Sequence, residues 1–279
     1  MLSMPRCDTP LVNESDQTRL PVFRLLLVVQ GLAAVVFGVV PLLLPRTFAS
    51  VTGYSGDDEF VYRLAGAATT GYVVAAIAAL VWRSAWLDIR IALIGTLTFT
   101  TAAALACLVT VIGGDRHWVV IVVLLAAAAF AVIAAYWLRR DAGALIPAGQ
   151  PISPVFKVII GLATLSAGVF GVMPLVAPTQ FASLFGLVGT DTWIFRMAGA
   201  ACLGYATAGI LEFRAAGLRR IAVQNLGAIG FNVAGAASAW LALLIVGHGG
   251  LLAPVIAAAA TTFAVLLIWI QRSAQEGPG

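Results

Sequence analysis

The chain has 279 residues, of which 61% are hydrophobic and only 10% are charged, and its mean hydropathy is +1.02. A soluble domain of this length could not cover so much apolar surface, so the composition predicts an integral membrane protein. The formal charge of +4 comes from basic residues scattered between apolar runs, a distribution that argues against a nucleic-acid-binding surface.

Residues 1–21 are polar and mixed in charge, and they contain no apolar run that could form the core of a signal peptide. We interpret them as a mobile cytoplasmic tail. Eight apolar runs follow, each about 20 residues or longer, which lets a helix cross roughly 30 Å of hydrocarbon. A helix satisfies its own backbone hydrogen bonds in lipid, so the predicted fold is all-α with eight transmembrane helices. The runs are 22–44, 60–82, 91–112, 118–138, 155–176, 193–213, 221–246 and 251–270.

The distribution of Lys and Arg predicts the orientation of these helices. Twelve of the sixteen basic residues fall in the N-terminal tail, the second, fourth and sixth connections, the C-terminus and the adjoining span ends. The positive-inside rule therefore places both termini in the cytoplasm. A single lysine beside fifteen arginines, with abundant Ala and Gly, indicates a GC-rich bacterial gene, and hence a multi-pass protein of the cytoplasmic (inner) membrane.

A segment of the chain occurs twice. Aligning residues 22–72 with residues 155–205, without a gap, gives 24 identities in 51 positions, which indicates an internal repeat. Because each copy contains four spans, an even number, both copies enter the membrane in the same direction and form parallel repeats. The predicted organisation is a tail, two membrane repeats of four helices joined by a cytoplasmic linker rich in Pro and Gly, and a C-terminal tail: 1–21, 22–140, 141–154, 155–272 and 273–279.

Proline, glycine and aspartate mark the same turns in both repeats. Two prolines near the end of the first span of each repeat should kink or end that helix. The residues after them read as a short interfacial helix or turn closed by Gly53 and by Gly186. Asp58 and Asp191 then stand at the expected N-cap positions of the second and sixth spans.

Arg63 and Arg196 follow these aspartates by five residues, so both lie inside the predicted membrane boundary, where a charge costs up to roughly 3 kcal/mol. One interpretation is that the two arginines reach back to the outer headgroups or bond free carbonyls. The other is an anion site, with each arginine holding a phosphate or carboxylate. Glu59 could pair with Arg63, but Thr192 stands at the matching position of the second copy, so that pair cannot explain both.

Small residues share the helical face of each arginine. They either leave space for a ligand or allow close packing of helices, and the second use is more frequent. They are Gly66, Ala67 and Thr70 beside Arg63, and Gly199, Ala200 and Leu203 beside Arg196.

Tyr72 and Tyr205 lie on the opposite face, near the middle of the membrane, where a phenol requires a hydrogen-bond partner. We include both tyrosines with the arginines as candidate ligand-binding residues. The other strong polar groups inside spans are expected to bond between helices: Gln30, Gln224, Asn225 and Asn232.

The sequence contains no catalytic, nucleotide-binding or metal-binding motif, so we predict no cofactor and no metal. Glu212 is at the cytoplasmic end of its span, which leaves no carboxylate at the centre of any span for a proton or cation relay. His117 and His248 fall in outer connections and are expected to be solvated loop residues without metal-ligand spacing. An ordinary hydrolase, redox enzyme or ATP-driven pump is therefore disfavoured.

Each repeat opens with a basic residue followed by spaced glycines, Arg24 with Gly31 and Gly38, and Lys157 with Gly161 and Gly168. This pattern resembles the DoxX-like superfamily of small bacterial membrane proteins, with the chain as two fused copies. The resemblance implies a four-helix bundle for each repeat, in a superfamily most of whose members lack an assigned activity.

Two functions from different classes fit these observations. The first is binding, with or without transport, of a lipid-like or anionic amphiphile at outer sites near Arg63 and Arg196. The second is a non-catalytic accessory or scaffold subunit, which would assemble with another membrane protein, or with itself, through the Ala-rich fourth and eighth spans. An enzyme acting on a membrane-embedded substrate is a third class, because Arg, Tyr and amide groups can stabilise charge without an obvious base.

Overall fold

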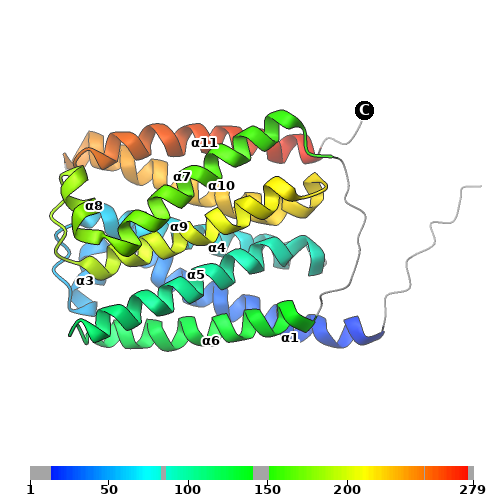
Figure 1. Cartoon of the computed structure of the whole chain (residues 1–279), viewed down its shortest axis with the longest axis horizontal. Helices are drawn as coiled ribbons and strands as arrows, with labels where there is room; N and C mark the ends of the chain where they lie inside the picture. The colour runs from blue at the N-terminus through cyan, green and yellow to red at the C-terminus, as the bar shows by residue number, and fades with distance from the viewer. Residues whose placement is uncertain (1–13, 83–85, 141–150, 248, 276–279) are drawn as a thin grey trace, which may run out of the picture.

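A computed structural model describes residues 14–82, 86–140, 151–247 and 249–275, and within these residues every regular element is helical (Figure 1). The first half contains α1 (Glu14–Ala34), a π-helical turn η1 (Val35–Val39), α2 (Val40–Leu43), α3 (Pro45–Thr52), α4 (Glu59–Val81), α5 (Trp86–Ile112) and α6 (Trp118–Arg140). The second half contains α7 (Pro154–Val176), α8 (Pro178–Phe185), α9 (Thr192–Arg214), α10 (Leu218–Leu241), a second π-helical turn η2 (Ala242–Val246) and α11 (Leu252–Gln275).

Eight helical segments of the described chain are long and apolar enough to cross a membrane. The all-α, multi-pass fold predicted from composition is therefore confirmed. The helix α1 begins at Glu14, inside the predicted tail, whereas the first apolar span begins at Arg24. The rest of that tail, residues 141–150 of the predicted linker, and His248 lie outside the described residues.

The prolines and glycines act locally as predicted. The first span passes through the π-helical turn η1, where the hydrogen-bond pattern loosens, and ends at Leu43, after which Pro45 opens α3. In the second half Pro174 lies inside α7, and Pro178 opens α8. Gly53 and Gly186 end α3 and α8 with φ of 87° and 69°, left-handed values that glycine adopts without steric cost.

The helices of the two halves interleave. In each half the second and third spans make few contacts with one another. The third span packs instead on the second span of the other half. Thus α5 packs on α9 and α6, whereas α10 packs on α4 and α11, and α4 and α9 meet at the centre. The result is two layers, α1–α4–α10–α11 and α7–α9–α5–α6 (Figure 1). The four helices of one half are therefore not a self-contained bundle, unlike the arrangement that the family resemblance implies.

The two ends of the molecule differ in charge. Four of the basic side chains that the structure describes lie at the end that holds α3 and α8 (the α3/α8 end): Arg46, Arg63, Arg116 and Arg196. The opposite end, here called the basic end, carries twice as many: Arg24, Arg90, Arg139, Lys157, Arg214, Arg219, Arg220 and Arg272. Figure 1 shows that α1 and α7 both start at the basic end, so the two halves run in the same direction.

Candidate functional site

Arg63 is held by a neighbouring carboxylate. Its guanidinium lies 3.2 Å from a Glu59 oxygen, one helical turn away, and the Arg63 side chain is only 15% exposed. Glu59 also pairs with Arg46, whose side chain is 83% exposed. Both arginines line a polar cleft of about 660 Å³ at the α3/α8 end, together with Asp57 and Asp58. Because Glu59 pairs with Arg63, the charge of this arginine already has a partner within the chain.

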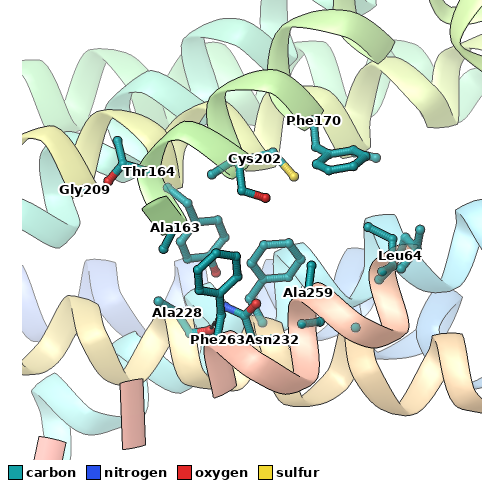
Figure 2. Close-up of a pocket in the computed structure, with 18 of the residues that line it drawn as sticks. Leu64, Ala163, Thr164, Phe170, Cys202, Gly209, Ala228, Asn232, Ala259 and Phe263 are labelled. Carbon is teal, nitrogen blue, oxygen red and sulfur yellow. Dashed lines mark hydrogen bonds between the residues drawn. The ribbon is translucent and has the colours of Figure 1, made fainter. Parts of the chain in front are cut away.

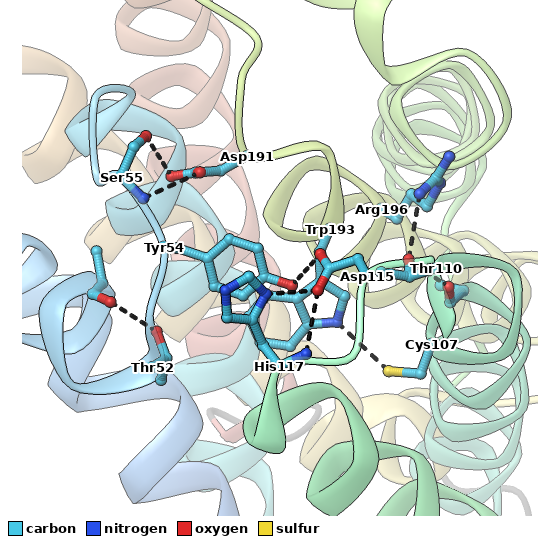
Figure 3. A network of polar contacts seen from close by, with 12 residues as sticks. Thr52, Tyr54, Ser55, Cys107, Thr110, Asp115, His117, Asp191, Trp193 and Arg196 are labelled. Carbon is cyan, nitrogen blue, oxygen red and sulfur yellow. Dashed lines mark hydrogen bonds and ion pairs between the residues drawn. The ribbon is translucent and has the colours of Figure 1, made fainter. Parts of the chain in front are cut away.

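Arg196 has a different environment from Arg63. Its guanidinium donates to the Thr110 hydroxyl at 3.1 Å, so it bonds α5 of the other half (Figure 3). It forms no ion pair in the part of the chain that the structure describes. The two arginines occupy matching sequence positions, but they do not form a matched pair of sites.

The small residues beside the arginines are used for packing and leave no space for a ligand at the two glycines. A Cβ added to Gly66 would lie 2.5 Å from the Gly38 carbonyl, and one added to Gly199 would lie 2.6 Å from the Gly171 carbonyl. The first helix of each half therefore fills this face with its backbone. Of the two interpretations offered by the sequence, helix packing is correct at these positions.

Asp58 and Asp191 occupy the predicted N-cap positions, but neither side chain caps its own helix. Each carboxylate instead reaches the loop that leads into the other helix. Asp58 accepts hydrogen bonds from the backbone of Val188 (2.8 Å) and Gly189 (2.7 Å). Asp191 accepts from Ser55 (3.2 Å) and Gly56 (2.8 Å). The prediction of a local cap is therefore wrong: these aspartates join the two halves.

Burial changes the pKa of the Asp58 carboxyl more than the hydrogen bonds to it do. Desolvation raises its pKa above the ordinary value of 3.8, while the backbone N–H groups of Gly189 and Val188 partly offset this effect.

Tyr54, Asp115 and His117 form a polar network at the α3/α8 end that the sequence did not reveal (Figure 3). The Tyr54 hydroxyl donates to Asp115 at 2.7 Å, and His117 bonds the other carboxylate oxygen. The Tyr54 ring also stacks on Trp193, with centroids 5.2 Å apart. His117 is an exposed loop residue, as expected, but it also has a carboxylate partner. Asp115 and His117 are two residues apart, whereas no spacing signal could have shown the contact of Tyr54, which is 61 residues from Asp115.

Burial acts to raise the pKa of Asp115, but hydrogen bonds from Tyr54 and His117 outweigh it and hold this pKa below the ordinary value of 3.8. Burial and the adjacent Asp115 together raise the pKa of Tyr54 far above 10.0, so its hydroxyl stays protonated.

Tyr72 on α4 and Tyr205 on α9 each donate a hydrogen bond to the backbone of the other's helix, at the centre of the molecule. The Tyr72 hydroxyl donates to the Ala201 carbonyl and the Tyr205 hydroxyl to the Ala68 carbonyl, both at 2.9 Å. Their rings lie 4.8 Å apart. Each phenol thus has the partner that burial requires, and each ring also forms part of a cavity wall.

One cavity, here called the α7–α11 cavity, runs along the interior of the second half. It has a volume of about 120 Å³ and is enclosed by α7, α9, α10 and α11, with α4 from the first half. Figure 2 shows Phe170 and Cys202 on one side of it and Ala259 and Phe263 on the other. Its α9 lining runs from Phe195 to Glu212, which at 1.5 Å per residue is about 25 Å. The cavity therefore extends through most of a hydrocarbon layer of roughly 30 Å.

The first half holds a matching space, here called the α1–α6 cavity, which is divided. Its two parts have volumes of about 90 Å³ and 30 Å³, and Gln30 and Tyr72 line both. Gln30 on α1 donates to Thr96 on α5 at 3.3 Å, and this bond crosses the space. Ala163 and Ala228 stand at the matching positions of the second half, so the α7–α11 cavity continues without a bridge.

Five of the six aromatic rings that line each cavity stand at matching positions of the two halves. They provide an apolar wall, with one phenol whose hydroxyl is turned to a carbonyl. The rings are Phe37, Phe48, Tyr72, Phe99 and Phe130 in the α1–α6 cavity, and Phe170, Phe181, Tyr205, Phe231 and Phe263 in the α7–α11 cavity.

Glu212 lines the α7–α11 cavity near the basic end. Its side chain is only 6% exposed, and its Oε1 atom has no hydrogen-bond partner among the residues that the structure describes. Gln224 lines the cavity as well and is also buried. Glu212 was not among the predicted site residues, because it lies near the end of its span. The available signal was the comparison with Ala79, which occupies the matching position of the first half.

Some, but not all, of the polar side chains that were expected to form hydrogen bonds between helices do so. Asn225 on α10 donates to Gln271 on α11 at 2.8 Å, and Gln30 bonds α5 as described above, so both confirm the prediction. Asn232 differs, because it donates to the Ala228 carbonyl of its own helix at 2.8 Å and lines the α7–α11 cavity.

No cluster of three or more His, Cys, Asp or Glu side chains that could hold a metal ion occurs in the described part of the chain. Comparisons with protein-family models, curated proteins and solved structures found no match to this chain.

Proposed function

We propose that the protein binds an elongated, largely apolar amphiphile in the α7–α11 cavity, and that lipid-like molecules are its ligand class. The observation that carries this proposal is the unbroken, aromatic-lined cavity that follows α9 for about 25 Å. An apolar cavity of roughly 150 Å³ is large enough to bind benzene. A volume of about 120 Å³ therefore holds only part of a long alkyl chain, and the rest of the chain would lie in the seam between α7 and α11.

The packing of the helices supports entry from the side. α7 and α11 touch at few positions, and within the described residues α1 and α6 touch at fewer still. Both cavities therefore border on a weakly closed seam between the first and fourth spans of a half. A ligand that partitions into lipid could enter through this seam without crossing the polar ends of the molecule.

The proposal assigns binding to the cavity rather than to the arginines. Arg63 is paired with Glu59, and Gly66 and Gly199 pack against backbone, so an anionic ligand would have to displace existing contacts. The membrane setting we propose is the inner membrane of a bacterium. The excess of basic side chains at the basic end supports a cytoplasmic location of that end and of both termini.

We further propose that the two halves derive from one duplicated unit, with the DoxX-like superfamily as a possible source. The 24 identities in 51 positions and the matched aromatic linings support the duplication. On this view the α7–α11 cavity kept an open path after duplication, whereas Gln30 and Thr96 closed the path in the first half.

Filling the cavity tests the proposal. Ala259 on α11 lines the cavity, whereas the adjacent Ala258 is exposed. In phosphatidylcholine nanodiscs, hexadecanol should raise the unfolding midpoint of the wild-type protein saturably, since a ligand that binds the native state stabilises it. Ala259→Phe should abolish this rise, and the control Ala258→Phe should retain it. An equal rise in all three proteins would refute binding in this cavity.

The accessory role rests on the Ala-rich fourth and eighth spans. Several of these alanines are buried within the chain itself: Ala127 and Ala134 on α6, and Ala257, Ala260 and Ala264 on α11. Their use in internal packing favours the binding function over assembly with another membrane protein.

A further inference from the structure

We propose that the α7–α11 cavity selects an amphiphile with a cationic head, such as a protonated amine, which is bound by the Glu212 carboxylate. This inference rests on the proposed function, because it names the head group of the molecule that the cavity holds. The apolar body would lie along the aromatic wall toward the α3/α8 end, and the head would lie near the basic end.

Glu212 occupies a position where a carboxylate is costly without a partner. It is 6% exposed, and no residue of the described ranges donates a hydrogen bond to its Oε1 atom. It also lies in the last turn of α9, which ends at Arg214, and the negative end of a helix dipole disfavours an anion. A buried charge normally has a paired group, so the arrangement leaves one interaction to be supplied from outside the chain.

The cavity supplies no compensating charge of its own. Its lining contains no Arg, Lys or His, although several arginines lie at the basic end. The Gln224 amide and the Thr164 hydroxyl line the same cavity as Glu212. An ammonium group could donate to Glu212 and to such neutral oxygens at once, because it carries three donors. The aromatic wall is also compatible with a cation.

The first half shows that the fold does not need this carboxylate. Ala79 and Ala92 stand where the second half has Glu212 and Gln224, and Ala79 is equally buried. The same helices therefore pack with a methyl group at this position. Glu212 and Gln224 occur only in the half whose cavity is continuous. Their presence therefore goes with the open cavity and is not required for packing of the helices.

The test compares hexadecylamine with hexadecanol, which share one chain and differ in the head. Both are titrated into wild-type protein in phosphatidylcholine nanodiscs at neutral pH, and the ligand fraction at half-maximal stabilisation is measured. Because hydrogen bonds to charged groups are stronger than those between neutral groups, the amine should bind about tenfold or more tightly than the alcohol. Glu212→Gln, which keeps the shape of the side chain, should remove this preference and leave hexadecanol binding unchanged. Glu212→Asp should keep part of it.

The outcomes separate this inference from the proposed function. If both compounds bind with equal affinity to the wild-type protein, and Ala259→Phe abolishes both, the cavity binds amphiphiles and the Glu212 inference is overturned. An amine preference that persists in Glu212→Gln overturns it as well. If neither compound stabilises the wild-type protein more than it stabilises Ala259→Phe, both proposals fail. The wild-type comparison decides even if a variant does not fold.

Discussion

Asp58 and Asp191 each bind the loop that leads into the other's helix, but only Asp191 also accepts a hydrogen bond from a tyrosine. The Tyr62 hydroxyl donates to it at 2.8 Å, and the Ser55 hydroxyl donates at 3.1 Å. Phe195 replaces Tyr62 at the matching position of the second half, so Asp58 has no such partner. Asp191 therefore contributes more hydrogen bonds between the two halves than Asp58 does.

We predict that Asp191→Ala destabilises the protein more than Asp58→Ala. Asp191 satisfies two backbone and two hydroxyl donors, whereas Asp58 satisfies two backbone donors. Each buried donor left without a partner costs about 1–3 kcal/mol. The difference in the free energy of unfolding should therefore be about 1 kcal/mol or more, measured by denaturant unfolding in detergent. Tyr62→Phe removes a single bond and should cost about 1 kcal/mol. Equal decreases in the free energy of unfolding for the two aspartate variants would contradict the larger role of Asp191.

Transferring the polar bridge should close the α7–α11 cavity. Ala163→Gln together with Ala228→Thr places the Gln30 and Thr96 pair of the first half at the matching positions of the second. The new side chains would occupy the middle of the cavity, so stabilisation by hexadecanol should fall about as far as in Ala259→Phe. Gln30→Ala provides the reverse case, because it should join the two parts of the α1–α6 cavity. A bridge variant that still binds hexadecanol would show that the cavity is not used along its whole length.

The Asp115 network predicts a loss of stability in acid. Its folded-state pKa lies below the ordinary value of 3.8, so the folded state favours the ionised carboxyl. This contribution is fully present above the unfolded pKa of about 3.9 and disappears as the pH falls through the lower, folded value. The unfolding midpoint should therefore drop more steeply in wild type than in Asp115→Asn below about pH 4. Parallel pH profiles would exclude a stabilising role for the Tyr54–Asp115–His117 contacts.

The sequence predicted the spans but could not predict their partners. Apolar run length located all eight helices, and Gly53 and Gly186 located two helix ends, because both signals are local. The insertion of α9 between α4 and α5 has no local signal, since helices in lipid are apolar on every face and no stripe marks the protein-facing side. Glu212 was missed for a similar reason: its depth along α9 was readable, but its burial depends on α10 and α7.

The contact between Tyr72 and Gly204 offers a last test of the central packing. A Cβ added at Gly204 would collide with the Tyr72 hydroxyl and would lie 2.6 Å from the Gly95 carbonyl. Because backbone cannot move aside easily, Gly204→Ala should cost about 1–3 kcal/mol in the free energy of unfolding. Gly168→Ala is the matched control: its Cβ would meet only the Ala206 Cβ, at 4.0 Å, and alanine is the better helix former. Tyr72→Phe removes the hydroxyl and should partly rescue Gly204→Ala, whereas equal effects of the two glycine substitutions would contradict the close approach of α9 to α4.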